Sequence, residues 1–285
     1  MALATDSPLP SGQCYVCGEP TAPRRIGTND LDVCRTCGFG RVAAIAPVDD
    51  YWARSEDAEH ELAERYWQAR TGVFRRALAQ VGGSRGPGRV VDLGGGVGYF
   101  AACAIEEGWD AFSVDVSEHA VQAAAARIGS DRSMARAPAD LEGTCDLVTL
   151  WCVVAHVPDP RAVVADALRL LKPEGRLLVT TPNFLFQARY ASVTARLGRP
   201  LDFVASDHLL HFTPAAMDRL LTGAGATRRS FSYWGITEDC LLERRLATLL
   251  VPAKRAWNWG AWQVSRAGTP LLTSELQVEA VRARE

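Results

Sequence analysis

The chain has 285 residues, a length that favours one large domain together with a smaller one. Hydrophobic residues make up 48% and charged residues 22%, proportions that exclude a disordered or fibrous protein. The 31 basic and 33 acidic residues give a formal net charge of -2, so no basic excess favours nucleic acid as a partner. The sequence shows no apolar run that could span a membrane and no secretory leader. We therefore expect a cytoplasmic protein without a membrane span.

Cysteines mark the first predicted domain. Cys14 and Cys17 form one pair, Cys34 and Cys37 form the other, and sixteen residues separate the two pairs. A glycine follows each pair and can adopt the positive φ that a metal-binding turn needs. Four thiolates leave no open coordination position, so the spacing favours a structural zinc ribbon over residues 1–47. Catalytic zinc, a redox dithiol and an iron site are the alternatives. We expect the other four cysteines to be small buried hydrophobes.

A helical segment is expected to lead into the larger domain, which we place at residues 48–285. An irregular apolar stripe among charged residues predicts helical structure over residues 48–82. A run of glycines with one proline then interrupts the chain at 82–88. This run is the clearest boundary before the alternating elements that follow.

Strands and helices alternate after this boundary. Strands are predicted at 89–93, 109–114, 133–137, 146–151 and 176–181, with two closing strands at 226–234 and 275–283. Helices are predicted at 97–108, 118–128 and 159–172, the second of them capped by Ser117. A turn is predicted at 172–175. The alternation predicts an α/β fold with a doubly wound, mostly parallel seven-stranded sheet of Rossmann-like type, covered by helices on both faces.

A glycine-rich segment joins the first of these strands to the first helix. Asp92 precedes three glycines, Gly94, Gly96 and Gly98, in a place where α/β sheets bind ligands. A dinucleotide fingerprint would require a further glycine at position 99, which is Tyr99, and the Lys-Ser/Thr of a phosphate-binding P-loop is missing. The spacing therefore favours a ligand without a pyrophosphate.

The pattern D-x-G-x-G-x-G resembles the class I S-adenosylmethionine-dependent methyltransferases. The resemblance extends over residues 48–285 and implies S-adenosylmethionine as the cofactor. An acidic residue at the end of the family's second strand binds the ribose hydroxyls, and Asp115 occupies that position here. The alternative for Asp115 is a neighbour of a helix cap.

The same resemblance implies adenine contacts at Ala139 and Asp140, which precede the fourth strand. A solvated loop acid is the alternative for Asp140. Val116 and Trp151 complete the cofactor-binding residues that we expect from the resemblance.

Methyl transfer to a hydroxyl or an acidic carbon needs a base, and histidine suits that role near neutral pH. His156 lies in a segment that resembles the E-H-V-P-D-P segment of ubiquinone-pathway O-methyltransferases. Cys152 and Ala155 stand where those enzymes carry glutamates, so we do not expect a divalent-metal role here. We expect His156 to fix its loop through ring N–H bonds.

A second histidine segment follows the fifth strand. Asp207 and His208 resemble the Glu-His pair of zinc-ribbon sugar C-methyltransferases, in which the histidine is the general base. The resemblance assigns that role to His208 and an orienting role to Asp207. His211 is either a further catalytic residue or an anchor of the loop. A metal at His208 and His211 would need a third ligand, and the sequence does not indicate one.

These observations predict an enzyme, an S-adenosylmethionine-dependent methyltransferase with a structural zinc ribbon. The expected reaction is O-methylation of a small-molecule hydroxyl, on a sugar or natural product, in specialised-metabolite or glycan biosynthesis. The alternative is C-methylation of a nucleotide-linked deoxy-keto-sugar, although such enzymes carry a further C-terminal α/β domain. A non-catalytic binding scaffold is a third hypothesis. A homodimer is compatible with the sequence.

Overall fold

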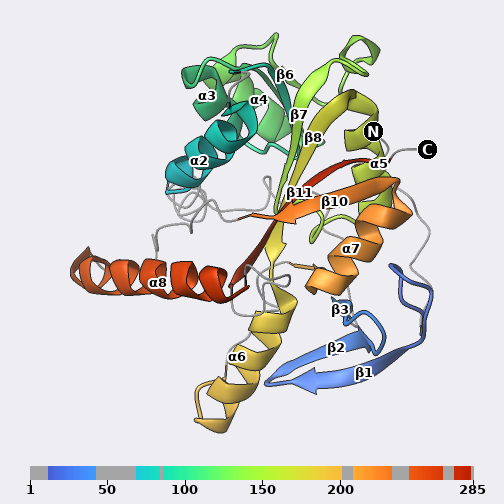
Figure 1. Ribbon diagram of the computed structural model, residues 1–285, viewed down its shortest axis with the longest axis vertical. Helices are drawn as coiled ribbons and strands as arrows, with labels where there is room; N and C mark the ends of the chain where they lie inside the picture. Colours follow the sequence, from blue (N-terminus) through green and yellow to red (C-terminus); the bar gives the residue numbers. More distant parts are fainter. Residues whose placement is uncertain are drawn as a thin grey trace.

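The computed structural model describes residues 12–42, 69–83, 86–200, 208–232, 244–265 and 273–283, and every structural statement below concerns these ranges (Figure 1). They form a large twisted sheet with flanking helices and, beside it, a small antiparallel sheet built mainly from the N-terminal segment. No helix among the described residues is both long and apolar enough to cross a membrane.

The large sheet has seven strands in the order β10-β11-β8-β7-β4-β5-β6. Strand β11 pairs antiparallel with both of its neighbours, and the other pairs are parallel. This topology confirms the predicted fold class. The strands are β4 (Arg89–Leu93), β5 (Asp110–Val114), β6 (Ser133–Met134), β7 (Cys145–Trp151), β8 (Leu171–Pro182), β10 (Ala226–Phe231) and β11 (Glu275–Arg282).

Helices connect the strands and begin at the residues that favour helix starts. Side chains of Ser117, Asp159 and Thr213 each accept a hydrogen bond from a backbone N–H in the first turn of the helix that follows. The helices are α2 (Thr71–Gly82), α3 (Tyr99–Glu106), α4 (Glu118–Ile128), α5 (Pro160–Leu170), α6 (Phe184–Arg196), α7 (Pro214–Gly223) and α8 (Arg244–Ser265), with a short 3-10 turn, η2, at Ala139–Leu141.

The core lies on both faces of the large sheet because successive strand residues point to opposite sides. Val90 and Leu178 pack with α2 and α3 on one face. Their neighbours Val91 and Leu177 pack with α5 and α7 on the other. All four side chains are fully or almost fully buried. Strands with nearly continuous apolar sequences are expected where helices cover both faces of a parallel sheet.

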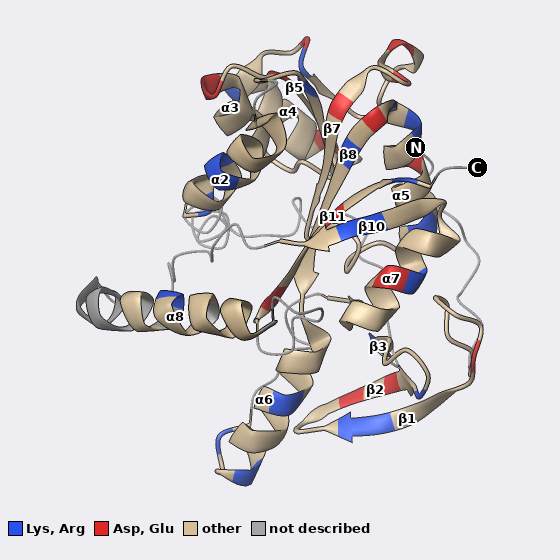
Figure 2. Cartoon of the chain, in the orientation of Figure 1, with Lys and Arg blue, Asp and Glu red and all other residues tan. Residues whose placement is uncertain are grey.

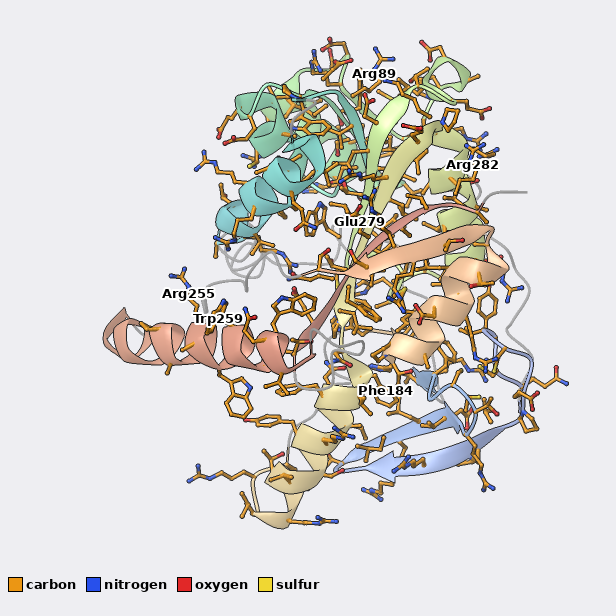
Figure 3. The ribbon with its side chains drawn as sticks, viewed as in Figure 1. Arg89, Phe184, Arg255, Trp259, Glu279 and Arg282 are labelled. Atoms are coloured by element: carbon orange, nitrogen blue, oxygen red, sulfur yellow. The ribbon has the colours of Figure 1, made fainter. Side chains whose placement is uncertain are left out.

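The small sheet contains β1 (Thr21–Ile26), β2 (Asn29–Cys34), β3 (Gly40–Val42) and β9 (Leu210–His211), in that order. Its last strand comes from the connection after β8, so the N-terminal segment is hydrogen-bonded to the larger part of the chain. Phe184, at the start of α6, packs with the apolar side chains of β1 and β2 (Figure 3). The predicted domain boundary at residue 47 lies outside the described residues.

Two local predictions differ from the structure. The segment 172–175, predicted as a turn, belongs to β8, which already pairs with β7 at Leu171. Cys145 pairs with Leu171 and Leu147 pairs with Arg176, so the register shifts between them. Residues 172–175 therefore form an irregularity within β8. The third strand is shorter than predicted, because only Ser133 and Met134 pair with β5. Of the predicted helical lead-in, α2 confirms the final part, and residues 48–68 lie outside the described ranges.

The long helix α8 extends away from the large sheet (Figure 1). Its Trp257 and Trp259 are each about 60% exposed, and Figure 3 shows Trp259 on this helix, away from the sheet. Basic and acidic residues are both spread over the large sheet and its helices (Figure 2). This distribution agrees with the small net charge of the sequence.

Candidate functional site

The glycine-rich segment forms a tight bend between β4 and α3. Gly94, Gly96 and Gly98 have φ values of 71°, 53° and 82°, in the left-handed region that favours glycine. A Cβ on Gly94 would lie 2.5 Å from Cγ2 of Val153, and one on Gly98 would lie 2.9 Å from the Cβ of Ala124. The bend therefore depends on glycine for both its conformation and its close contacts, and it leaves backbone rather than side chains at the carboxyl end of β4.

Asp115, directly after β5, holds this bend in place. Its Oδ2 accepts a hydrogen bond of 2.8 Å from the backbone N–H of Gly96, and its Oδ1 accepts one of 3.0 Å from that of Ser117. The residue is only 8% exposed. A carboxylate offers about four acceptor positions, so this arrangement is compatible with ligand hydroxyls bound at the same group.

Asp92, the last acidic residue before the bend, lies completely inside the sheet. Burial raises the pKa of its carboxyl to about 8, although the hydrogen bond donated by Thr149 opposes the shift. The Oγ1 of Thr149 lies 2.6 Å from Oδ1 of Asp92. This hydrogen bond ties the end of β4 to the neighbouring strand β7.

The other predicted cofactor residues fall into two groups. Val116, beside Asp115, is an apolar side chain that is 49% exposed, and Ala139 and Asp140 are exposed in η2. Trp151 differs, because its ring is buried between the rings of Phe74 and Phe100, at centroid distances of 4.9 and 5.3 Å. Its predicted contact with the cofactor stays a prediction.

The four N-terminal cysteines lie together at the ends of the small sheet. Three Sγ–Sγ separations are 3.6 Å, far from the roughly 2.05 Å of a disulfide. A tetrahedral zinc ion with Zn–S bonds of about 2.3 Å would hold its sulfurs about 3.8 Å apart. The arrangement therefore fits a zinc ion, which Cys14, Cys17, Cys34 and Cys37 would hold.

The turns after each cysteine pair follow the prediction for a zinc ribbon. Gly18 and Gly38 have positive φ values of 74° and 72°. The backbone N–H of Gly18 donates to the carbonyl of Cys14 at 2.8 Å, and that of Gly38 donates to the carbonyl of Cys34 at 3.0 Å. Gly38 also allows a close approach, because a Cβ there would lie 2.8 Å from Cγ2 of Thr213.

Hydrogen bonds join this cysteine-rich segment to two parts of the large domain, through the Tyr15 side chain and through the backbone carbonyls of Tyr15 and Cys37. The Tyr15 hydroxyl donates to the carboxylate of Asp159, which also caps α5, and Arg161 donates to the Tyr15 carbonyl at 3.2 Å. On the other side, the Thr213 hydroxyl donates to the carbonyl of Cys37 at 2.5 Å and caps α7. The ribbon is thus anchored next to the segment that carries His208 and His211, the predicted catalytic histidines, and next to the loop that carries His156.

The structure brings His208 into contact with two residues from the loop after β7. Nε2 of His208 lies 3.3 Å from Sγ of Cys152, and Nε2 of His156 lies 3.9 Å from the same sulfur. The two imidazole rings are 4.6 Å apart, centroid to centroid. All three ligand atoms lie within 4.8 Å of one another. We call these residues the Cys-His-His cluster.

This cluster corrects two expectations from the sequence. Cys103 and Cys145 are buried as expected, but Cys152 is only half-buried and contacts two histidines. The sequence indicated no third ligand for a metal at His208 and His211; in the structure His208 instead lies with Cys152 and His156, and His211 is not in this group. The four-residue spacing of a cysteine and a histidine just after a strand was the only local signal.

The remaining catalytic predictions have separate outcomes. His211 lies on β9, is 2% exposed, and packs against the ring of Phe184 at 5.2 Å. This position agrees with the anchoring alternative. Burial lowers the pKa of His211 to about 4 and that of His208 to about 3, so both imidazoles are neutral at neutral pH. Asp207 lies outside the described residues.

Residues 66–230 match a family model described as a methyltransferase domain. Curated relatives include the ubiquinone biosynthesis O-methyltransferases of Psychrobacter arcticus, 28% identical over 156 residues, and Methylococcus capsulatus, 30% identical over 134 residues. These matches cover 50% and 44% of this chain, and 60% and 52% of the relatives. The chain therefore spans only about half to three fifths of their length.

Solved structures share the fold. A chain of the Haloferax volcanii complex of the Trm112 methyltransferase activator superposes with a TM-score of 0.53 at 18% identity, over 84% of this chain and 100% of that one. The plantazolicin methyltransferase BamL, in complex with a triazolic desmethylPZN analog and SAH, superposes with a TM-score of 0.51 at 14% identity, over 82% of this chain and 93% of that one.

Proposed function

Because the chain belongs to the methyltransferase-domain family, we propose that it uses S-adenosylmethionine to methylate a hydroxyl oxygen of a small-molecule acceptor. The acceptor would be a sugar or natural product in specialised-metabolite or glycan biosynthesis. The similarity to two ubiquinone biosynthesis O-methyltransferases supports oxygen as the methylated atom. The Cys-His-His cluster, next to the glycine bend, is the observation that carries the proposal for the site.

The reaction moves one methyl group and one proton. A lone pair of the acceptor oxygen forms the new O–C bond, the C–S bond of the sulfonium breaks with its electron pair going to sulfur, and the hydroxyl proton leaves. S-adenosylmethionine supplies an already activated methyl group, so the protein mainly has to align oxygen, carbon and sulfur. Removal of the proton is the step that needs a polar group of the protein.

The cofactor would lie over the glycine bend at the carboxyl ends of β4 and β5. We propose that Gly94, Gly96 and Gly98 offer backbone to it and that Asp115 accepts hydrogen bonds from the ribose hydroxyls. The exposed side chain of Val116 suits contact with the adenine ring, because an apolar surface beside the ribose-binding acid would otherwise face water. Ala139 and Asp140 would complete the adenine end.

Proton removal is proposed at the Cys-His-His cluster. Val153, between two members of the cluster, packs against Gly94, so the cluster loop and the glycine bend are in direct contact. The family resemblance assigns the base to His208, and its Nε2 faces the cluster loop, 3.3 Å from Sγ of Cys152. Asp207 keeps its predicted orienting role as a proposal.

The four N-terminal cysteines are proposed to hold a structural zinc ion. Their closed arrangement leaves no position for a reacting oxygen, so the ion would stabilise the ribbon rather than act on the acceptor. The ribbon in turn contacts Asp159 and Thr213, which flank the two loops of the cluster.

A labelled-methyl assay tests the proposed function. The full chain is incubated with S-adenosylmethionine carrying a deuterated methyl group and with a panel of hydroxylated sugars and natural products. We expect S-adenosylhomocysteine and a product that carries the label in an O–CD3 group, as read by mass spectrometry and deuterium NMR. Absence of S-adenosylmethionine binding by calorimetry would contradict the proposal and favour a non-catalytic scaffold.

The C-methylation alternative has its own measurement. An enzyme that methylates carbon next to a keto group must remove the α-carbon proton, and it should exchange that proton with D2O even without S-adenosylmethionine. An O-methyltransferase should show no such exchange. Exchange in a nucleotide-linked deoxy-keto-sugar would therefore replace the proposed hydroxyl acceptor.

A further inference from the structure

The Cys-His-His cluster joins two segments that are far apart in the sequence. Cys152 and His156 come from the loop after β7, and His208 comes from the connection that follows α6. The backbone N–H groups of Leu209 and Leu210 both donate to the carbonyl of Ala155, at 2.9 and 3.0 Å. These two bonds hold His208 against the loop that carries the other two ligands.

The backbone at Cys152 is held in a conformation that a cysteine rarely adopts. Its φ is 63°, and it is the only residue other than glycine in the described ranges with a positive φ. Such a conformation is strained for a residue with a side chain and persists only where surrounding contacts impose it. Here the backbone N–H of Cys152 donates to Thr180, whose carbonyl and hydroxyl oxygens lie 3.1 and 3.0 Å away. The strained turn places the sulfur next to both imidazoles.

The separations within the cluster match those of ligands around one zinc ion. With Zn–S of about 2.3 Å and Zn–N of about 2.0–2.1 Å, a tetrahedral site holds sulfur and nitrogen about 3.6 Å apart. The two sulfur–nitrogen distances, 3.3 and 3.9 Å, lie on either side of this value. Thiolate and imidazole are also the donors that zinc prefers, whereas magnesium and calcium prefer oxygen.

We propose that Cys152, His156 and His208 bind a zinc ion that keeps one coordination position open. Three protein ligands with a free fourth position distinguish catalytic zinc sites from closed structural ones. This site is separate from the four-cysteine ribbon, which provides a complete set of four ligands of its own.

The open position gives the site a role in the reaction, and this role rests on the proposed function. Val153 carries the contact between the cluster loop and Gly94, so an acceptor hydroxyl bound at the open position would lie beside the proposed cofactor site. Zinc lowers the pKa of an oxygen ligand by several units, and the hydroxyl proton would leave to water. The resulting oxyanion would attack the methyl carbon as its C–S bond breaks. Nε2 of His208 would then be a zinc ligand, which replaces its predicted role as a free base.

Metal content of the purified full chain tests the binding itself. We expect about two equivalents of zinc in the wild type, one in each cluster. Cys152→Ser, His156→Ala and His208→Ala should each lower this to about one equivalent. Cys103→Ser and His119→Ala are the matched controls, because Cys103 is buried in α3 and His119 is exposed on α4, and both should retain the wild-type content.

A rescue variant separates a zinc ligand from a general base. His208→Cys provides another ligand that zinc accepts, and it should restore the second equivalent of zinc that His208→Ala loses. A base role alone predicts that neither variant changes the zinc content. Cobalt substitution adds a spectroscopic readout, since thiolate-to-cobalt absorption from the second site should be present in His208→Cys and missing in Cys152→Ser.

Crystals of the wild type give a test that does not depend on variants folding. An anomalous difference map at the zinc edge should show a second peak about 2.3 Å from the sulfur of Cys152. One equivalent of zinc in the wild type, or full zinc content in all three alanine and serine variants, overturns the inference. If only the proposed function is wrong, the result is distinct: the protein would contain two equivalents of zinc but transfer no methyl group to any hydroxyl.

Discussion

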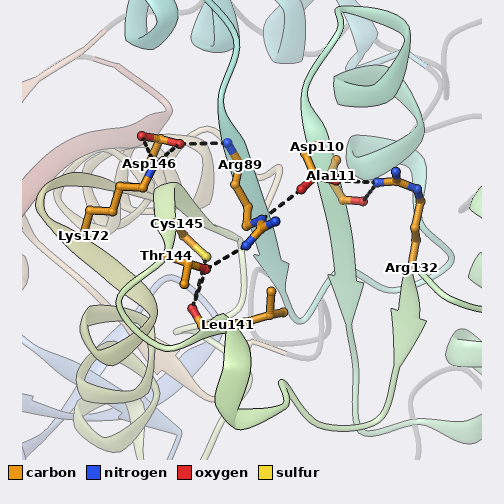
Figure 4. A network of polar contacts seen from close by, with 9 residues as sticks. All are labelled: Arg89, Asp110, Ala111, Arg132, Leu141, Thr144, Cys145, Asp146 and Lys172. Atoms are coloured by element: carbon orange, nitrogen blue, oxygen red, sulfur yellow. Dashed lines mark hydrogen bonds and ion pairs between the residues drawn. The ribbon is translucent and has the colours of Figure 1, made fainter.

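The two edges of the large sheet carry different chemistry. At the carboxyl ends of its parallel strands lie the glycine bend, Asp115 and the Cys-His-His cluster. At the amino ends lie ion pairs: Arg89 and Arg132 both contact Asp110 at 2.9 Å, and Lys172 contacts Asp146 at 2.7 Å (Figure 4). Ligand sites of open α/β sheets form at the carboxyl edge, so we assign function to that edge and stability to the other.

The carboxylates at the two edges also differ in how deeply they are buried and in their hydrogen-bond partners. Asp115 is 8% exposed and bonds to backbone N–H groups, whereas the Asp110 side chain is 40% exposed and bonds to arginines. A buried carboxylate that orders a loop affects what the loop can bind. An exposed ion pair affects mainly the free energy of unfolding, and only slightly. Substitutions at the two edges should therefore change different measured quantities.

The largest expected effect concerns the ribbon, which supports the carboxyl edge from outside. Cys34→Ser removes one of four thiolates. In zinc-finger peptides the free energy of zinc binding, which drives their folding, is about 10–16 kcal/mol. We expect hydrogen exchange to rise through 12–42 and 208–213, because β3 pairs with β9, while β4 in the sheet interior stays protected.

The matched control for this variant is Cys145→Ser, which changes a buried thiol outside any cysteine cluster. It should leave exchange in the ribbon unchanged. Wild-type exchange at 208–213 in Cys34→Ser would show that the ribbon does not support the histidine loop.

The second effect tests the chemistry at the carboxyl edge. His208→Ala should lower turnover by roughly 10²–10⁴, the range expected when a group that handles the reacting proton is lost. Affinity for S-adenosylmethionine, measured by calorimetry, should stay within about twofold, because His208 contacts Cys152 and His156 rather than the glycine bend. His119→Ala, on the exposed surface of α4, should change neither quantity. Full turnover in His208→Ala would remove this residue from the mechanism.

Local sequence signals were sufficient for most of the fold. Helix α4 has the predicted bounds, and its cap Ser117 makes the expected bond, because capping and periodicity act over a few residues. The glycine bend could also be predicted from the local sequence, because the positive φ at Gly94 and Gly98 favours glycine independently of distant parts of the chain. The irregularity at 172–175 could not be predicted from the local sequence, because it depends on the pairing of β8 with β7.

Long-range contacts explain what the sequence did not indicate. The Cys-His-His cluster needs His208 to meet Cys152 across more than fifty positions, and that meeting depends on backbone bonds to Ala155. The pairing of β3 with β9 is also long-range. The local spacing of Cys152 and His156 does not indicate that His208 joins them, and no local pattern indicates the pairing of β3 with β9, so both contacts become visible only in the folded chain.

A smaller effect is expected for the carboxylate that holds the glycine bend. Asp115→Ala removes the acceptor of the Gly96 and Ser117 N–H groups. A hydrogen bond to a charged group contributes about 1.5–3 kcal/mol, so the affinity for S-adenosylmethionine should fall roughly 10–150-fold. Calorimetry measures this directly. Unchanged affinity would contradict the proposed ribose contact, and the opposite-edge variant Asp110→Ala serves as the control.

The smallest effect belongs to the amino edge itself. Asp110→Ala should lower the free energy of unfolding by about 0.2–1 kcal/mol for each exposed ion pair and leave cofactor affinity unchanged. Burial alone would raise the pKa of Asp110, but hydrogen bonds from Arg89 and Arg132 reverse this and lower it. A lowered folded-state pKa means that the stabilisation is present above the ordinary carboxyl pKa of about 3.9 and is lost as pH falls below it. Urea unfolding of wild type and variant should therefore differ at pH 7 and converge in acid. A variant that instead loses affinity for S-adenosylmethionine would show that the two edges are energetically coupled through β5, which joins Asp110 to Asp115 over five residues of strand.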